Sequence, residues 1–448
     1  MEMYYTPNDK ANMAMTDSLS IQNAIDKAHE DGINAVRIPR WNERTQTDIW
    51  EIDNTILLYS NMHLVIDNAH LRMKDGVFCP MICNKNAELE TGGFLDGEQH
   101  DIWITGCGNA VLDGGEPNGL NEYTSMQDGK PHVYKNLTIF MRNVRNFRVE
   151  GLKILNHRWW GMAFLFCQKG RITDIHFSLT RHHIDVHMQW RNQDGINLRV
   201  GCQDIEIDHI TGQTGDDVIA LTALNGFETQ FWVEGKSGDI KNILIHDVRA
   251  TSNSSAHVRL LCHFGNKISN VTMRDIYDVG VKGKEARAHV MFWIGEDGYY
   301  FGEKDLRAGE GDISDITIEN VYARAMTVMM FEVGVKNLSA KNIHVEGESG
   351  YVACFGSYCQ PGPVALYEDS TAEWIDGKQV LPIHKEYPTV VKNIFIEKVF
   401  YHGCGKAESL FGFNHCRFEN LKIRDVVNES DKPMVSFFDM ENQTIDIT

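Results

Sequence analysis

A short apolar pattern recurs along most of this chain. Its form is apolar, any, apolar, any, polar, apolar, and it occurs at residues 205–210, 243–248, 271–276, 316–321, 394–399 and 421–426. Period-two alternation predicts strands with one buried face, and a short strand that returns every ~20–50 residues is typical of a solenoid. Asn or Asp usually stands just before a strand (Asn242, Asn270, Asp315, Asn393), where local hydrogen bonds can turn the chain between two sides of a coil. We therefore predict an all-β fold, a right-handed parallel β-helix. A β-sandwich or propeller is less favoured, because Asn-Gly hairpin turns are scarce.

The N-terminal segment predicts a cap for the solenoid at about residues 15–40. Ile21, Ala24, Ile25 and Ala28 would share one face of a helix, with Ser18 or Ser20 as its N-cap, and a strand would follow at 35–39. No Pro/Gly/Ser-rich linker or charge run interrupts the pattern, so we expect one domain over 1–448, with coils from about residue 41. Two strand-poor stretches, about 113–135 and 350–387, are expected to be loops on the binding side.

Composition narrows the choice of partners. The formal net charge of −19 argues against nucleic acid, and no apolar run is long enough to cross a membrane. The ten cysteines lack metal-ligand spacing, and reduced thiols suit a cytoplasmic protein. The first 15 residues show neither a basic start nor an apolar stretch. We therefore expect a cytoplasmic location, or a secreted or periplasmic one if a leader has been removed, and homo-oligomer formation stays open.

Three carboxylates stand in two motifs one coil apart. Asn192-Gln193-Asp194 precedes Gly215-Asp216-Asp217, and 216 − 194 = 22 residues. Neighbouring coils of a parallel helix lie about 4.8 Å apart, so the acids should lie close together. Like charges at such distances cannot all ionise, and one acid should keep its proton. Hydrolysis of a glycosidic bond needs one protonated acid and one ionised carboxylate. Turn aspartates alone would explain one motif, but not two at this spacing with a histidine, His257, downstream.

At these residues the chain resembles the polygalacturonase-like enzymes of glycoside hydrolase family 28, over most of its length. The family pattern is Asn-Thr-Asp, Asp-Asp, Gly-His-Gly and Arg-Ile-Lys. Asn192-Gln193-Asp194 and Asp216-Asp217 match the first two motifs, and His257 keeps the histidine of the third without its glycines. In the fourth, Arg287 is retained and His289 stands in place of the lysine. The resemblance implies that Asp216 donates the proton, and that Asp194 and Asp217 hold and deprotonate the water, which gives inversion.

Other residues near the motifs are candidates for substrate binding. Asn192 belongs to the first motif, Arg158 and Arg259 could bind hydroxyl or carboxylate groups, and Trp159 and Trp160 could offer apolar faces to sugar rings. Alternation places His183, Asp185 and His187 on one strand face, which could also present metal ligands. A polar strand lining a sugar groove is the better interpretation of His183 and His187. We predict neither a metal nor a cofactor.

The missing lysine affects substrate choice more than activity. In the family the Arg-Ile-Lys motif binds the substrate carboxylate, and Arg287 with His289 need not do so. We therefore expect a carbohydrate substrate that is a neutral or short oligosaccharide rather than polygalacturonate. Three alternatives stay open. They are a polysaccharide lyase that binds calcium at the Asp-Asp pair, a fructan-processing transferase, and a non-catalytic carbohydrate-binding β-helix.

Overall fold

The computed structural model describes residues 4–116, 133–179, 192–224, 231–253, 255–280, 288–295, 307–356, 373–375, 378–380, 389–438, 440 and 445–447. The chain divides into two compact units. Unit 1 comprises Met1–Asp216 and Gly226–Ser237, and unit 2 comprises Asp217–Asn225 and Gly238–Thr448. The strands of both units have the parallel pairing of a right-handed β-helix, as the sequence predicts. A single domain over 1–448 stays a prediction.

Unit 1 starts with the helix α1 (Asp17–Glu30), whose Ile21, Ala24, Ile25 and Ala28 are fully buried, as predicted. The predicted N-cap residue, Ser18 or Ser20, is wrong. The N-cap is Thr16, whose Oγ1 accepts a hydrogen bond from the Leu19 N–H at 3.3 Å. Ser18 and Ser20 lie inside the helix because it begins at Asp17. Within the described residues, no helix is both long and apolar enough to span a membrane.

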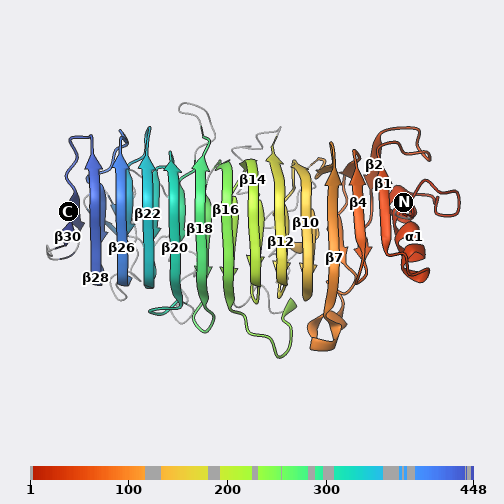
Figure 1. Ribbon diagram of the computed structural model, residues 1–448, viewed down its shortest axis with the longest axis horizontal. Coiled ribbons are helices and arrows are strands. Elements are labelled where there is room, and N and C mark those ends of the chain that lie inside the picture. Colours follow the sequence, from red (N-terminus) through yellow and green to blue (C-terminus); the bar gives the residue numbers. More distant parts are fainter. Residues whose placement is uncertain are drawn as a thin grey trace. The chain divides into compact units, whose positions relative to one another are not determined.

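Two parallel sheets form the coils of unit 1 (Figure 1). The longer strands are β1 (Ala35–Pro39), β4 (His63–Asp67), β7 (Gln99–Cys107), β10 (Val144–Leu155), β12 (Gln168–Ser178) and β14 (Gln203–Thr214), joined by β2 (Ile49–Ile52), β5 (His70–Met73) and β8 (Val111–Asp113). The second sheet contains β3 (Ile56–Leu58), β6 (Ile82–Asn84), β9 (Ile139–Arg142), β11 (Met162–Leu165) and β13 (Ile196–Arg199). Three short 3-10 helices, η1 (Glu90–Gly93), η2 (Leu95–Gly97) and η3 (Val133–Asn136), lie in the connections.

Unit 2 repeats the same coil. One sheet contains β16 (Ile240–Ser252), β18 (Ile268–Asp278), β20 (Ile313–Ala323), β22 (Val335–Val345), β26 (Thr389–Tyr401), β28 (Cys416–Asn428) and β30 (Asp446–Ile447). The other contains β15 (Ile219–Ala223), β17 (Ala256–Cys262), β19 (Val290–Ile294), β21 (Thr327–Phe331), β23 (Tyr351–Phe355), β27 (Phe411–Asn414) and β29 (Val435–Phe438). A separate antiparallel pair, β24 (Glu373–Ile375) and β25 (Lys378–Val380), lies within the predicted loop 350–387.

Asparagine and aspartate side chains bend the long strands. Asn242, Asn270, Asp315 and Asn393 all have φ between 54° and 58°, in the left-handed region that these residues tolerate. The sequence predicts them just before the strands, and this placement is wrong, because all four lie within the long strands. Their side chains bond from coil to coil; Asn337 Nδ2, for example, donates to Asp315 Oδ1 at 2.9 Å. The bend is therefore stabilised by both backbone preference and an amide ladder.

The short strands of unit 1 have an inner and an outer face. The Phe164 ring of β11 stacks at 4.9 Å on the Phe147 ring of β10, so Phe164 faces the interior between the two sheets. Side chains alternate along a strand. Ala163 and Leu165 of β11 consequently face outward, although both are fully buried. This outer face adjoins the predicted site.

Candidate active site

Two loops of unit 1 bring Asp194 and Asp216 together. Asp194 lies just before β13, and Asp216 lies just after β14. The Gln193 carbonyl oxygen joins the loops, because it accepts hydrogen bonds from the backbone N–H groups of Gly215 at 3.1 Å and Asp216 at 3.2 Å. One carboxylate oxygen of Asp194 lies within 4.8 Å of one of Asp216. Two acids at this distance can share the work of proton donation and proton removal.

Asp194 is fully buried and is oriented by β13. Asn197 Nδ2 donates to Asp194 Oδ2 at 2.9 Å, and Asn197 is itself fully buried. Asn197 stands in the sequence Ile196-Asn197-Leu198-Arg199, where polar residues alternate with apolar ones in a strand that is buried throughout. We did not predict Asn197 or Arg199 as site residues. The signal was present in this alternation, because a buried polar side chain needs a partner.

Asp217 follows Asp216 directly in the sequence. It belongs to unit 2 and is held by other residues of that unit. Its Oδ1 accepts from Ser255 Oγ at 2.7 Å and from the Ala256 N–H at 3.0 Å. Its Oδ2 lies 2.5 Å from Arg259 Nε, and Asp217 is fully buried. Arg259, predicted to bind substrate, therefore already neutralises a carboxylate. We did not predict Ser255 as a site residue either.

His257 of β17 is fully buried. Its Nε2 donates to the Ala250 carbonyl oxygen at 2.8 Å and lies 3.6 Å from Asp278 Oδ1. These contacts give the imidazole a packing role at the end of β16 and β18. Its catalytic role stays a prediction.

The predicted aromatic residues belong to a hydrophobic cluster of unit 1. Trp159 is 1 % exposed and Trp160 is 5 % exposed. Trp160 Nε1 donates to Asn192 Oδ1 at 2.8 Å, and the Arg199 guanidinium lies 4.5 Å from the centre of the Trp160 ring. Trp160 thus connects Asn192, of the first motif, to the core. At these exposures both rings are part of the hydrophobic core, and sugar stacking by either stays a prediction.

The remaining predicted binding residues have varied placements. Arg158 donates from Nη1 to the Val77 carbonyl at 2.7 Å and from Nη2 to the Lys74 carbonyl at 2.9 Å, and thereby holds that turn. His289 is half-buried and directly precedes β19, and its backbone N–H donates to the Ser255 carbonyl at 2.8 Å. His183, His187 and Arg287 lie outside the described residues.

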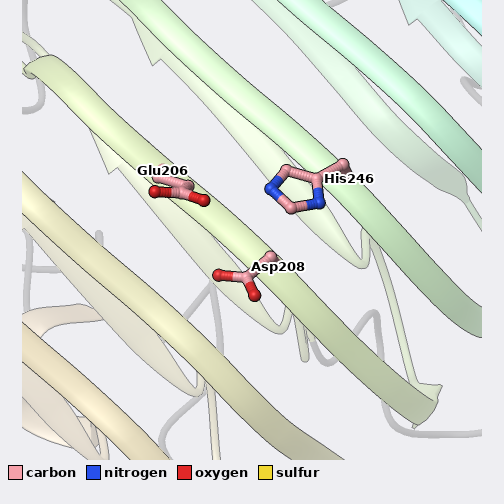
Figure 2. A group of neighbouring side chains, drawn as sticks. All are labelled: Glu206, Asp208 and His246. Carbon is pink, nitrogen blue, oxygen red and sulfur yellow. The ribbon is translucent and has the colours of Figure 1, made fainter.

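A second group of side chains of metal-ligand type is Glu206 and Asp208 on β14 and His246 on β16 (Figure 2). Asp208 accepts from Arg171 Nε and Nη2, each at 3.2 Å, and from Thr173 Oγ1 at 2.9 Å. Burial opposes ionisation, but these donors hold the pKa of Asp208 below its usual range. Arg171 already supplies the positive charge, so Asp208 is an acceptor within the fold.

Comparison with known proteins places the site in a family context. Residues 98–236 match the model of the glycosyl hydrolases family 28. No curated protein matches the chain. Among solved structures, PfbA, a surface adhesin of Streptococcus pneumoniae, is 10 % identical with a TM-score of 0.54, over 97 % of this chain and 91 % of that one.

Two polygalacturonases are also similar. The family 28 exopolygalacturonase of Yersinia enterocolitica is 13 % identical with a TM-score of 0.49, over 99 % of this chain and 78 % of that one. The polygalacturonase of Erwinia carotovora ssp. carotovora is 15 % identical with a TM-score of 0.44, over 99 % and 97 %. At these identities the structural likeness is one of fold alone. The family match over 98–236 includes both acid motifs, so this part of the chain is similar to the glycosyl hydrolases of family 28.

Proposed function

We propose that this protein hydrolyses a glycosidic bond of an oligo- or polysaccharide by acid–base catalysis with Asp194, Asp216 and Asp217. The observation that carries the proposal is the approach of the Asp194 and Asp216 carboxylates to within 4.8 Å. Mutual repulsion favours a state in which one of the two keeps a proton while the other is ionised. That state is what protonation of a leaving oxygen and activation of water require.

The roles follow the family resemblance. Asp216 donates its proton to the glycosidic oxygen as the bond to the anomeric carbon breaks. Asp194 and Asp217 bind the attacking water and take up its proton as its oxygen bonds to that carbon. Attack from the face opposite the leaving group gives an inverted product. The buried contacts of Asp194 with Asn197 and of Asp217 with Ser255 support these roles, because they hold each carboxylate in one orientation.

For the substrate we propose a neutral or short oligosaccharide rather than polygalacturonate. The lysine that reads the uronate carboxylate in the family is His289 here, and histidine is mostly neutral at pH 7. Two arginines that could have compensated already have partners. Arg259 pairs with Asp217, and Arg158 donates to the Val77 and Lys74 carbonyls.

A panel of defined oligosaccharides, followed by chromatography and proton NMR of the first anomer formed, tests the proposal. We expect metal-independent hydrolysis with an inverted anomer. A retained anomer would contradict the mechanism. An unsaturated product with ultraviolet absorbance, lost with EDTA and restored by calcium, would identify a lyase instead. Binding of a glycan without turnover would identify a carbohydrate-binding protein.

A further inference from the structure

Arg142, at the end of β9, is a buried cation surrounded by carbonyl oxygens. The residue is only 3 % exposed. Nε donates to the Phe231 carbonyl at 2.7 Å, Nη2 donates to that of Trp232 at 3.0 Å, and Nη1 donates to those of Ala87 and Leu89, both at 3.2 Å. Burial lowers its pKa to about 10, so Arg142 stays charged at neutral pH. Four carbonyls compensate this buried charge.

Two of these carbonyls belong to residues 231–236, which we call the strap. The strap precedes β16 in the sequence but packs on unit 1. The Phe231 ring meets the rings of Tyr134 at 4.4 Å and Phe140 at 5.4 Å. Lys236 Nζ at its end bonds Glu98 Oε2 at 2.9 Å and Asn143 Oδ1 at 2.6 Å.

The strap covers the outer face of β9 and β11. Phe140, Ala163 and Leu165 lie in the same hydrophobic cluster as Val233 of the strap, and all four are fully buried. Strand pairing connects this covered face to the site. Phe140 pairs with Ala163, and Ala163 pairs with Asn197, which orients Asp194. The covered surface thus ends one strand, about 4.8 Å, from the residue that positions a proposed catalytic acid.

We propose that Arg142 is a positioning residue that holds the strap over β9 and β11, which closes one side of the acid pair to the substrate and makes the enzyme act on chain ends. The inference rests on the proposed function. A sugar chain beside Asp194 cannot extend over β9 and β11, because aromatic and aliphatic side chains fill that face. Only one or two sugar units then fit between the acid pair and the strap, the rest of the chain lies on the open side, and each cleavage releases a short product.

The first measurement follows the strap itself by amide hydrogen exchange in the full-length protein. In Arg142→Met we expect exchange within 231–236 to rise at least tenfold, since the methionine offers no donor to the Phe231 and Trp232 carbonyls. Lys236→Met removes the contacts at the other end of the strap. It replaces Arg142→Met in this measurement if Arg142→Met folds poorly. Arg148→Met is the matched control, because Arg148 is a partly exposed arginine that pairs with Glu150. Unchanged exchange in both strap variants would overturn the role of Arg142 and Lys236.

The second measurement follows product size from the best glycan of the panel. We expect the wild type and Arg148→Met to release only mono- or disaccharide from the start. Arg142→Met or Lys236→Met should release longer oligosaccharides. An active wild type that produces mixed sizes from the start, or variants with a released strap and unchanged products, would overturn the inference while leaving the proposed function standing. A wild type that hydrolyses no glycan would remove the proposed function, and this inference with it.

Discussion

Gln193, which directly precedes Asp194, exchanges two hydrogen bonds with His157. Gln193 Nε2 donates to the His157 carbonyl at 2.6 Å, and His157 Nε2 donates to the Gln193 carbonyl at 3.0 Å. The same Gln193 carbonyl accepts the N–H groups of Gly215 and Asp216. His157 therefore supports the loop contact that brings Asp216 to Asp194.

Stability should depend on pH through His157. Burial lowers its pKa from 6.5 to about 4. Above pH 6.5 the imidazole is neutral in both the folded and unfolded states. As pH falls from 6.5 to 4, only the unfolded state takes up the proton, so up to about 3 kcal/mol of stability is lost over this window. Thermal unfolding should show a steeper fall of Tm between pH 6.5 and 4 for the wild type than for His157→Gln. His402→Gln, at a partly exposed histidine, is the control and should follow the wild type.

Asp194→Asn and Asp216→Asn should each lower kcat by about 10²–10⁴-fold, because a positioned general acid or base contributes that much. Asparagine keeps the shape of the side chain, so Tm should change little. Asp425→Asn is the matched control, since Asp425 is exposed and its φ of 55° is tolerated by asparagine. Full activity in either acid variant would refute the proposed mechanism.

Ser255→Ala removes a hydrogen bond to the Asp217 carboxylate. Hydrogen bonds to charged groups contribute about 1.5–3 kcal/mol, so kcat/KM should fall roughly 10- to 100-fold. Ser314→Ala removes a similar hydroxyl–carboxylate bond, to Asp315 at 3.0 Å, at an exposed position and should leave activity unchanged. Equal activity of the two variants would show that Asp217 needs no orientation by Ser255.

Substrate charge should discriminate strongly. Without the lysine of the family motif, polygalacturonate loses an interaction of about 1.5–3 kcal/mol, and its kcat/KM should be at least about tenfold below that of the best neutral oligosaccharide. Parallel assays of the two substrates measure this ratio. Faster cleavage of polygalacturonate than of every neutral glycan would mean that another cation has taken the lysine's place.

The amide ladder can be separated from the backbone bend at Asn337, whose φ is 59°. Asn337→Gly loses the side-chain bonds to Asp315 and Asn393 but keeps the bend. Asn337→Ala loses the bonds and also strains the backbone, so it should be about 1 kcal/mol less stable than the glycine variant. Denaturation midpoints of the two variants measure the difference; equal midpoints would assign the whole effect to the ladder.

The fold was predictable from the sequence because a solenoid repeats a local pattern. The alternation around Ile243 and Ile245, for instance, needs no knowledge of distant residues. The proximity of Asp194 and Asp216 followed for the same reason, since their spacing is one coil.

Contacts between distant segments were not predictable. Arg142 and Phe231 are 89 residues apart, and no local pattern pairs a buried arginine with the carbonyls of a later loop. Trp159 and Trp160 lie in the same hydrophobic cluster as Val233 of that loop, which packs over the outer face of the short strands. The bends at Asn242 and Asn393 were misplaced because the long strands continue through a left-handed residue, which an alternating pattern does not reveal.

Two rungs of the amide ladder in unit 2 have the same length. Asn337 bonds to Asp315 and Asn342 bonds to Asn320, in both cases across 22 residues. A segment of this length, such as 315–336, carries one long strand, one short strand and both bend positions. Because each such module presents the same register to the coil before and the coil after, a duplicated copy would insert without disturbing either neighbour. The protein can therefore change in size by whole modules, which gives evolution and protein engineering a way to lengthen the sheet of unit 2.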